Sequence, residues 1–216
     1  MFRQIICDQL ALTQAQASWA YLLPTASGKG RSLSLDARID LNDVQDEVKR
    51  ERLEDWLRSV TEAVGMNTAV AHALQGAVFE VRQGYKSKDS KRQNADIANA
   101  GTALMQGYLP VLVLMSAQMD TDLTLRYANA GWLILKGVPD ASASRSTFAF
   151  CTQVLDYDLA AFFQRCSPVL AAEVRAVLVA LLTPADTMPA STRSQELDLL
   201  ELTDEIDADD PDGLDF

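Results

Sequence analysis

Apolar and polar residues follow two different periods along the chain, and each period predicts one kind of element. In residues 31–41 apolar side chains recur at every second position, which is the pattern of a half-buried β-strand. In residues 42–64 the apolar positions instead form one broad helical stripe, and Asn42 or Asp43 can serve as the N-cap. We expect this helix to end at Gly65.

The same two periods of apolar residues predict the elements in the rest of the chain. Residues 9–23 have a mixed helical pattern, whereas residues 76–87 predict a strand that places Glu80, Arg82 and Lys86 on one face. Four further elements follow in the order helix, strand, helix, strand: residues 90–108, 109–116, 120–130 and 132–137. The first of these two strands is almost wholly apolar, as a central strand covered on both faces would be.

This alternation of strands and helices predicts the fold class. A strand followed by a helix and another strand favours parallel neighbours, so we expect an α/β fold with a central mixed sheet flanked by helices. Residues 148–182 predict two packing helices that separate near Pro168. The sequence then divides into a single α/β domain, a linker and an acidic tail: residues 1–182, 183–195 and 196–216.

The net charge of −11 is concentrated at the C-terminal end of the 216-residue sequence. Residues 196–216 contain ten acidic and no basic residues, which leaves 20 acidic against 19 basic residues in the remainder. The body is therefore nearly neutral, so the acidic composition does not argue against a nucleic-acid ligand. The charge density of the tail predicts that it is disordered in isolation.

What the sequence lacks disfavours several classes of function. No apolar run reaches the roughly 18 residues of a membrane span, and we expect no signal peptide. The three cysteines lie far apart, as reduced thiols of a cytoplasmic protein do. Because His72 is the single histidine, neither a histidine-based zinc site nor a Ser/His/Asp triad is expected. We therefore expect a cytoplasmic protein without a membrane partner.

Five basic residues gather within eleven positions, in the stretch RQGYKSKDSKR: Arg82, Lys86, Lys88, Lys91 and Arg92. This basic junction joins a predicted strand to a predicted helix, whose N-cap is Asp89 or Ser90. Lysine, arginine, serine and amide side chains are the groups that contact phosphates. We therefore assign DNA or phosphate contacts to seven residues: Arg82, Ser87, Ser90, Lys91, Arg92, Gln93 and Asn94. The alternative is a solvated, lysine-rich turn.

Two carboxylates near the basic junction suggest a metal site. Glu80 lies on the predicted strand, and Asp96 lies about two turns into the following helix. Mg²⁺ in phosphodiester hydrolysis takes one or two carboxylates, retained waters and the substrate phosphate. Glu80 and Asp96 are therefore the candidate metal ligands, and Lys86 or Lys88 is the candidate catalytic lysine. In the alternative, each carboxylate makes a structural ion pair: Glu80 with Arg82 or a neighbouring strand, and Asp96 with Arg92 at i, i+4.

The order of these features resembles the core of the PD-(D/E)XK nucleases, which type II restriction endonucleases use. The likeness covers residues 43–137, and YKSKDSKRQNAD is similar to the K-x-S…R-x-Q-N…E arrangement of one subgroup. The resemblance implies a Mg²⁺-dependent deoxyribonuclease in which Glu80 and Asp96 bind the metal and Lys86 or Lys88 is catalytic. It also implies a homodimer acting on DNA.

Two positions depart from the family pattern. Glu80-Val81-Arg82 carries arginine where the simple motif has lysine, and no Pro-Asp pair precedes the strand. Asp36 or Asp40 would supply the missing acid if the strand of residues 31–41 joined the site.

The sequence leaves two hypotheses from different classes. The leading one is a restriction-type endonuclease with a Mg²⁺ cofactor. The competing one is a non-enzymatic nucleic-acid-binding or assembly protein, in which the basic junction contacts phosphate and the acidic tail binds a protein partner. The tail of residues 196–216 resembles the acidic C-terminal tails of single-stranded-DNA-binding proteins, which also end in an apolar residue and dock partners.

Overall fold

The computed structural model describes residues 1–24, 30–84 and 90–183, apart from the side chains of residues 23, 24, 30, 31 and 90–92. The chain forms two compact units, residues 1–162 and 163–216. The acidic tail and all but the first residue of the linker lie outside the described residues.

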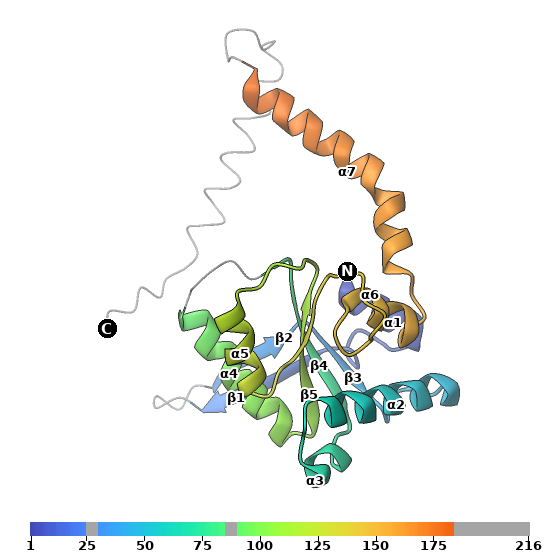
Figure 1. Cartoon of the computed structure of the whole chain (residues 1–216), viewed down its shortest axis with the longest axis vertical. Helices are drawn as coiled ribbons and strands as arrows, with labels where there is room; N and C mark the ends of the chain where they lie inside the picture. Colours follow the sequence, from blue (N-terminus) through green and yellow to red (C-terminus); the bar gives the residue numbers. More distant parts are fainter. Residues whose placement is uncertain (25–29, 85–89, 184–216) are drawn as a thin grey trace. The chain divides into compact units, whose positions relative to one another are not determined.

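The first unit combines helices with two sheets (Figure 1). Its helices are α1 (Phe2–Leu10), α2 (Glu47–Ala63), α3 (Thr68–His72), α4 (Ser90–Met105), α5 (Thr121–Asn129) and α6 (Thr147–Gln153). Its strands are β1 (Trp19–Pro24), β2 (Gly30–Leu35), β3 (Ala37–Asp40), β4 (Gly76–Arg82), β5 (Tyr108–Leu114) and β6 (Leu133–Leu135).

The main sheet has four strands in the order β3-β4-β5-β6. β3 runs antiparallel to β4, whereas β4, β5 and β6 are parallel to one another. β1 and β2 form a separate antiparallel pair. The predicted mixed α/β fold, with a mixed sheet flanked by helices, is therefore confirmed.

The predicted central strand is also confirmed. β5 lies between β4 and β6, and all seven of its residues are buried. Helices cover both faces of the sheet, so the side chains of β5 meet apolar neighbours in either direction. This arrangement explains the nearly unbroken apolar run in the sequence.

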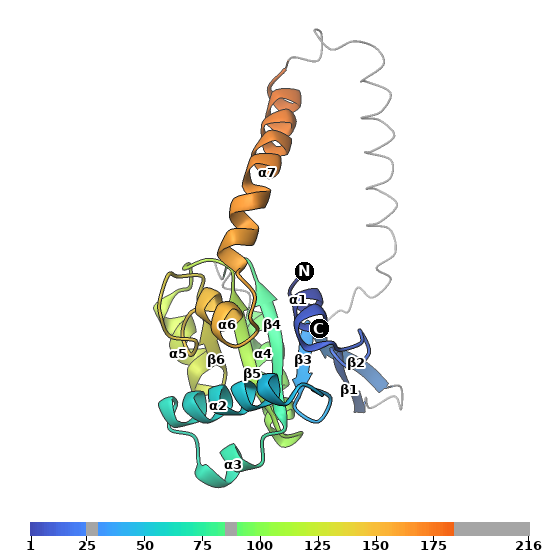
Figure 2. The same ribbon diagram turned by 90° about the vertical axis from the view of Figure 1, so that its right-hand side faces the viewer.

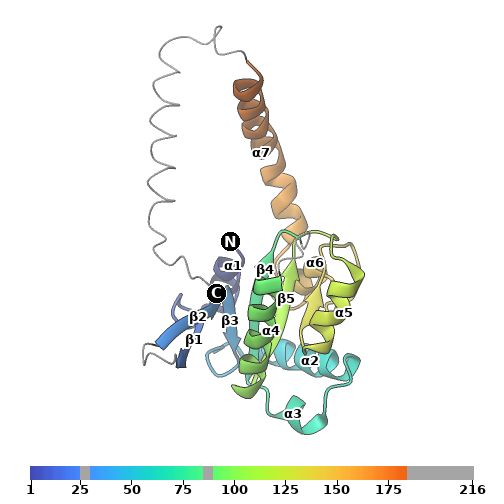
Figure 3. The same cartoon turned by 90° about the vertical axis from the view of Figure 1, so that its left-hand side faces the viewer.

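Two apolar layers hold these helices against the sheet. On one face Phe79 packs against Phe2 and Phe150, with ring centroids 5.4 and 5.7 Å away, so α1 and α6 cover this side. On the other face Val78 belongs to a cluster that includes Ala100 of α4 and Tyr127 of α5. Figure 2 looks onto the face covered by α2 and α6, and Figure 3 onto the face covered by α4.

The helix predicted over residues 9–23 is wrong. α1 ends at Leu10, because Ala11 adopts a left-handed conformation with φ of 55°. The later part of the segment is β1, in which Trp19 and Tyr21 are buried and Ala20 is exposed. A short segment of alanine, leucine and glutamine fits both periods, and the pairing of β1 with β2 selects the strand.

The strand predicted over residues 31–41 is present, but it is divided at Asp36. β2 pairs with β1, whereas β3 crosses into the main sheet and pairs with β4, with Ala37 opposite Phe79. The alternating pattern therefore predicted the conformation correctly, although it carried no information about the change of partner at Asp36.

Several predicted helix boundaries are also corrected. α2 begins after the N-cap Asp46 rather than after Asn42 or Asp43, which lie in the preceding loop. Tyr108 opens β5 and does not belong to the helix before it. The last two helices separate at residues 154–158, and Pro168 lies inside α7 (Leu159–Leu182).

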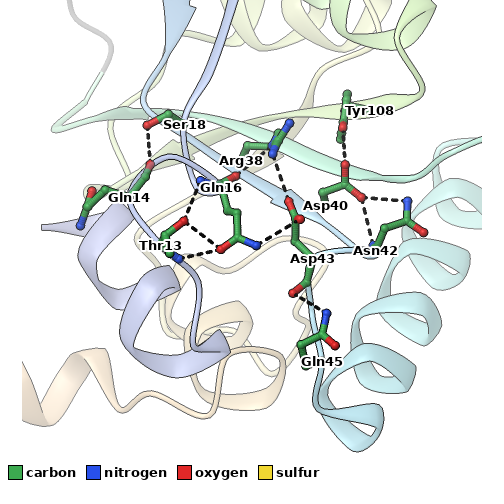
Figure 4. Close-up of polar contacts among 10 residues, drawn as sticks. All are labelled: Thr13, Gln14, Gln16, Ser18, Arg38, Asp40, Asn42, Asp43, Gln45 and Tyr108. Carbon is green, nitrogen blue, oxygen red and sulfur yellow. Dashed lines mark hydrogen bonds and ion pairs between the residues drawn. The ribbon is translucent and has the colours of Figure 1, made fainter.

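A network of polar side chains lies at the amino end of the parallel strands (Figure 4). Arg38 donates to Asp43 at 3.1 Å, and Gln16 Nε2 donates to the same carboxylate at 3.2 Å. Tyr108 donates its hydroxyl hydrogen bond to Asp40 Oδ2 at 2.6 Å. Burial and this hydrogen bond raise the pKa of Tyr108 to about 12. The network ties the segment after α1 to the β3–α2 loop, so we assign it a structural role.

In the second unit the described part is the remainder of α7, which runs to Leu182. Among the described residues no helix combines the length and apolar character that crossing a bilayer requires.

Candidate functional site

The two predicted metal carboxylates meet at Arg82. Glu80 and Arg82 project from the same face of β4 near its carboxyl end, and Asp96 faces them from α4. Arg82 Nη2 lies 2.8 Å from Glu80 Oε1 and 3.1 Å from each carboxylate oxygen of Asp96. The side chains of Glu80, Arg82 and Asp96 are 13%, 11% and 6% exposed, so the ionic cluster is largely shielded from water.

Asp96 is held by two further side chains. Tyr127, from α5, donates its hydroxyl hydrogen bond to Asp96 Oδ2 at 2.5 Å. Trp132 Nε1 donates to the main-chain oxygen of Asp96 at 3.2 Å. Both aromatic side chains are buried, and their polar atoms reach Asp96. We name Glu80, Arg82, Asp96 and Tyr127 the Arg82 cluster.

The Arg82 cluster contains one of the two structural ion pairs considered from the sequence. Glu80 pairs with Arg82, as that alternative states. Asp96 also pairs with Arg82, which lies 14 residues earlier in the chain. The structure does not describe the side chain of Arg92, the partner that the alternative names. The sequence suggested neither the Arg82–Asp96 contact nor the Tyr127 contact, because both join residues on different elements.

Two other predicted contact residues lie next to the cluster on α4. Arg126 of α5 donates from Nη1 to Gln93 Oε1 at 2.6 Å and from Nη2 to Asn94 Oδ1 at 2.8 Å. Gln93 is buried and Asn94 is exposed. One turn further along α4, Asn99 accepts a hydrogen bond of 2.6 Å from Tyr21 of β1. These hydrogen bonds tie α4 to α5 through Gln93 and Asn94 and to β1 through Asn99.

The remaining predicted residues have no described side chains. Lys86, Ser87 and Lys88 lie outside the described residues, between β4 and α4 in the chain. α4 begins with Ser90, Lys91 and Arg92, but the structure does not describe their side chains. The proposed roles of these six residues therefore remain predictions.

Of the two candidates for an additional acid, Asp36 lies at the relevant end of β4. Asp36 Oδ2 accepts a hydrogen bond of 2.7 Å from the main-chain N–H of Val81, next to Glu80. Asp40 pairs with Gly76 at the opposite end of β4 and accepts from Tyr108. Asp36 thus joins the carboxyl edge of the parallel strands, where open α/β sheets commonly bind ligands.

A pocket of about 490 Å³ opens beside Asp36. Its lining is mostly polar and includes Arg3, Gln4, Gln14, Asp36, Arg82 and Gln83. Arg3 Nε donates to the main-chain oxygen of Asp36 at 2.6 Å, which ties α1 to this edge. The pocket therefore lies at the carboxyl end of β4 beside α1, and of the Arg82 cluster it is lined by Arg82.

The donor chemistry of the cluster agrees in kind with a magnesium site. Mg²⁺ prefers carboxylate oxygens, commonly one or two, and fills its remaining positions with water and phosphate. Glu80 and Asp96 supply such oxygens, although Arg82 contacts them here and a metal ion would compete with its guanidinium. Among the described residues no three histidine, cysteine, aspartate or glutamate side chains gather as a metal cluster.

The charges explain why the cluster is held so firmly. Two carboxylates and one guanidinium sum to −1, and each charge loses most of its water on folding. Removing one partner from such a buried group typically costs about 3–5 kcal/mol, because the other charge loses its compensation. The cluster is therefore either a buried ionic group that stabilises the fold or a preformed binding site. In such a site a ligand would either replace the Arg82 guanidinium beside the carboxylates or contact it.

No family model matches the chain, and no curated protein or solved structure matches it either.

Proposed function

We propose that this protein acts on DNA as a Mg²⁺-dependent endonuclease of the restriction type, with a PD-(D/E)XK-like core. The observation that supports the proposal is the convergence of Glu80 and Asp96 on Arg82 at the carboxyl end of β4. The two carboxylates come from different elements, and the basic junction lies between them in the chain. Acidic groups beside cations are the arrangement that metal-assisted phosphodiester hydrolysis requires.

The order of elements agrees with the proposed core. An antiparallel strand, β3, brings Asp36 beside β4, and β4 leads through the basic junction into α4. A parallel apolar strand, β5, follows. In this proposal Glu80 and Asp96 hold Mg²⁺, which supplies Lewis-acid activation of the phosphate and of water when bound.

The protein's own residues then have separate tasks. Arg82 offsets part of the charge of the two carboxylates and keeps both oriented toward one point. Lys86 or Lys88 orients or deprotonates the attacking water, and the remaining residues of the basic junction contact the phosphate backbone. The resemblance to restriction enzymes adds a homodimeric assembly to the proposal, and the three widely separated cysteines add a cytoplasmic location.

A second candidate function follows from the same contacts. Because Arg82 already pairs with both carboxylates, the cluster can serve as a structural core beneath a DNA-binding surface. In that case the protein binds nucleic acid without cutting it, and the acidic tail of residues 196–216 binds a protein partner.

Cleavage of supercoiled plasmid and phage DNA with Mg²⁺ or Mn²⁺ tests the proposal. We expect the wild type to produce discrete fragments and Glu80→Gln to produce none while still binding DNA. Glu62→Gln is the matched control, because Glu62 is an exposed glutamate of α2. Intact DNA with salt-sensitive binding by the wild type would reject the nuclease and support the binding protein. Absence of both cutting and binding would reject both functions.

A further inference from the structure

The contact between α5 and α4 brings a cation that the sequence did not single out to the proposed DNA-binding surface. Arg126 lies in the last turn of α5, and its guanidinium spans the side-chain amides of Gln93 and Asn94 at 2.6 and 2.8 Å. Both amides were assigned to phosphate contact from the sequence alone. Arg126 is 33 residues from Gln93 in the chain, so only the fold places them together.

The positive charge of Arg126 is not balanced by these contacts. Its two acceptors are neutral amide oxygens, and Arg126 itself is exposed. Within the described part of the chain it forms no ion pair, and this includes Asp122, one turn earlier on α5. A guanidinium has five N–H donors, and these two bonds use two of them. Donors and charge therefore remain for a third group.

A purely structural role explains part of this arrangement. A cation in the last turn of a helix interacts favourably with the helix dipole, typically by about 0.3–1 kcal/mol. That interaction does not require the guanidinium to reach across to a neighbouring helix. Holding a long, exposed side chain in one conformation also costs entropy, and two neutral hydrogen bonds at the surface offset it only in part.

We propose that Arg126 is a DNA-contacting and positioning residue. It orients Gln93 and Asn94 of α4 and places its own charge beside them to bind the phosphodiester backbone. This inference rests on the proposed function, and it adds α5 to a binding surface that the sequence confines to residues 82–94. The ligand class is the phosphate backbone of DNA, since the contacts involve charge and amide donors rather than an apolar pocket.

The salt dependence of DNA binding separates a phosphate contact from a structural role. Each phosphate neutralised by a protein cation contributes about 0.9 to the slope of log K against log salt concentration on duplex DNA. Loss of the Arg126 charge should therefore reduce the magnitude of that slope by about one and weaken binding several-fold. A role confined to the stability of α5 would leave the slope unchanged.

The experiment measures fluorescence anisotropy of a labelled mixed-sequence duplex at several salt concentrations, without a divalent metal so that the DNA stays intact. Arg126→Gln removes the charge but keeps an amide donor, whereas Arg126→Lys keeps the charge. Arg58→Ala is the matched control, because Arg58 is an exposed arginine of α2, on the other face of the sheet. Thermal unfolding of each variant verifies that it is folded.

We expect Arg126→Gln to lower the slope by about one, Arg126→Lys to retain it, and Arg58→Ala to match the wild type. A wild-type slope in Arg126→Gln would overturn the inference and leave the proposed function standing. An equal loss in Arg58→Ala would also overturn it, because the effect would then reflect net charge alone. A wild type that binds no DNA would overturn both the inference and the proposed function.

Discussion

Arg82 Nη2 lies 3.1 Å from each of the two carboxylate oxygens of Asp96, and this ion pair links β4 to α4. The same nitrogen contacts Glu80 at 2.8 Å, so a single guanidinium organises both carboxylates of the candidate site. The stability of the first unit and the geometry of the proposed site therefore depend on the same group of charges.

We expect Asp96→Ala to lower the free energy of unfolding by about 1.5–3 kcal/mol, because the buried guanidinium of Arg82 would lose one of its two carboxylate partners and Tyr127 would lose the acceptor of its hydroxyl hydrogen bond. Urea unfolding followed by circular dichroism measures this difference. Arg145→Ala is the control: it removes an ion pair with Asp140 whose arginine side chain is 72% exposed. The control should change the same quantity by less than about 1 kcal/mol. Equal effects of the two substitutions would contradict a buried role for the Arg82 cluster.

The pH dependence of stability should reveal the contact between Tyr108 and Asp40. In the folded protein burial and the hydrogen bond to Asp40 raise the pKa of Tyr108 from 10.0 to about 12. The folded state therefore retains the phenolic proton at a pH where the unfolded state has lost it. The resulting stabilisation is complete below pH 10 and is lost as the pH rises toward 12.

Comparison with Tyr108→Phe isolates this effect, because the two proteins differ only in the hydroxyl group of Tyr108. At pH 8 we expect the wild type to be more stable by about 1.5–3 kcal/mol, the usual range for a hydrogen bond to a charged group. The difference should shrink between pH 10 and pH 11.5 in urea unfolding experiments. A difference that stays constant over this interval would mean that Tyr108 titrates normally in the folded state.

The thiols of the first unit should be unreactive in the native protein. Burial raises the pKa of Cys151 to about 12, and burial followed by the charge of Asp8 raises the pKa of Cys7. The thiolate is the reactive form, so alkylation at pH 8 requires unfolding. We expect mass spectrometry to find iodoacetamide on Cys151 in urea but not in buffer. Rapid labelling of Cys151 in buffer would show that this part of the core opens readily.

Gly76→Ala tests the pairing that brings β3 to the site. A Cβ atom on Gly76 would lie 2.0 Å from the main-chain oxygen of Ile39, so β3 and β4 would have to separate. We expect a large fall in the unfolding midpoint, measured by thermal melting. Gly101→Ala is the control, because a Cβ there meets nothing within 4 Å, and alanine favours the helix by up to about 1 kcal/mol. Comparable stability of the two variants would argue against the β3–β4 register.

The sequence predicted the elements with long, regular patterns and missed those that depend on a partner. β5 was recognised because seven buried residues in succession leave little choice of environment. The sequence pattern of β1 predicts helix, and its strand conformation depends on pairing with β2. Likewise the N-cap of α2 is Asp46, whereas nearby Asn42 and Asp43 were equally acceptable by residue type.

The candidate site shows the same division. Glu80 and Asp96, predicted as ligands of one metal ion, both lie beside Arg82, and their metal-binding role stays a prediction. Tyr127 and Arg126 were not selected, although each contacts a candidate residue. Their contacts span 31 and 33 residues, and no local pattern encodes the docking of α5 against α4.

The contacts of Asp96 also have a consequence for the order in which the chain folds during synthesis. Arg82 precedes Asp96, but Tyr127 and Trp132 emerge 31 and 36 residues after it. A nascent chain that ends before α5 would thus have to bury Asp96 without two of its hydrogen-bond donors, which disfavours early docking of α4. We therefore expect α4 and α5 to assemble on the sheet in one cooperative step after Trp132 has been synthesised, rather than one after the other.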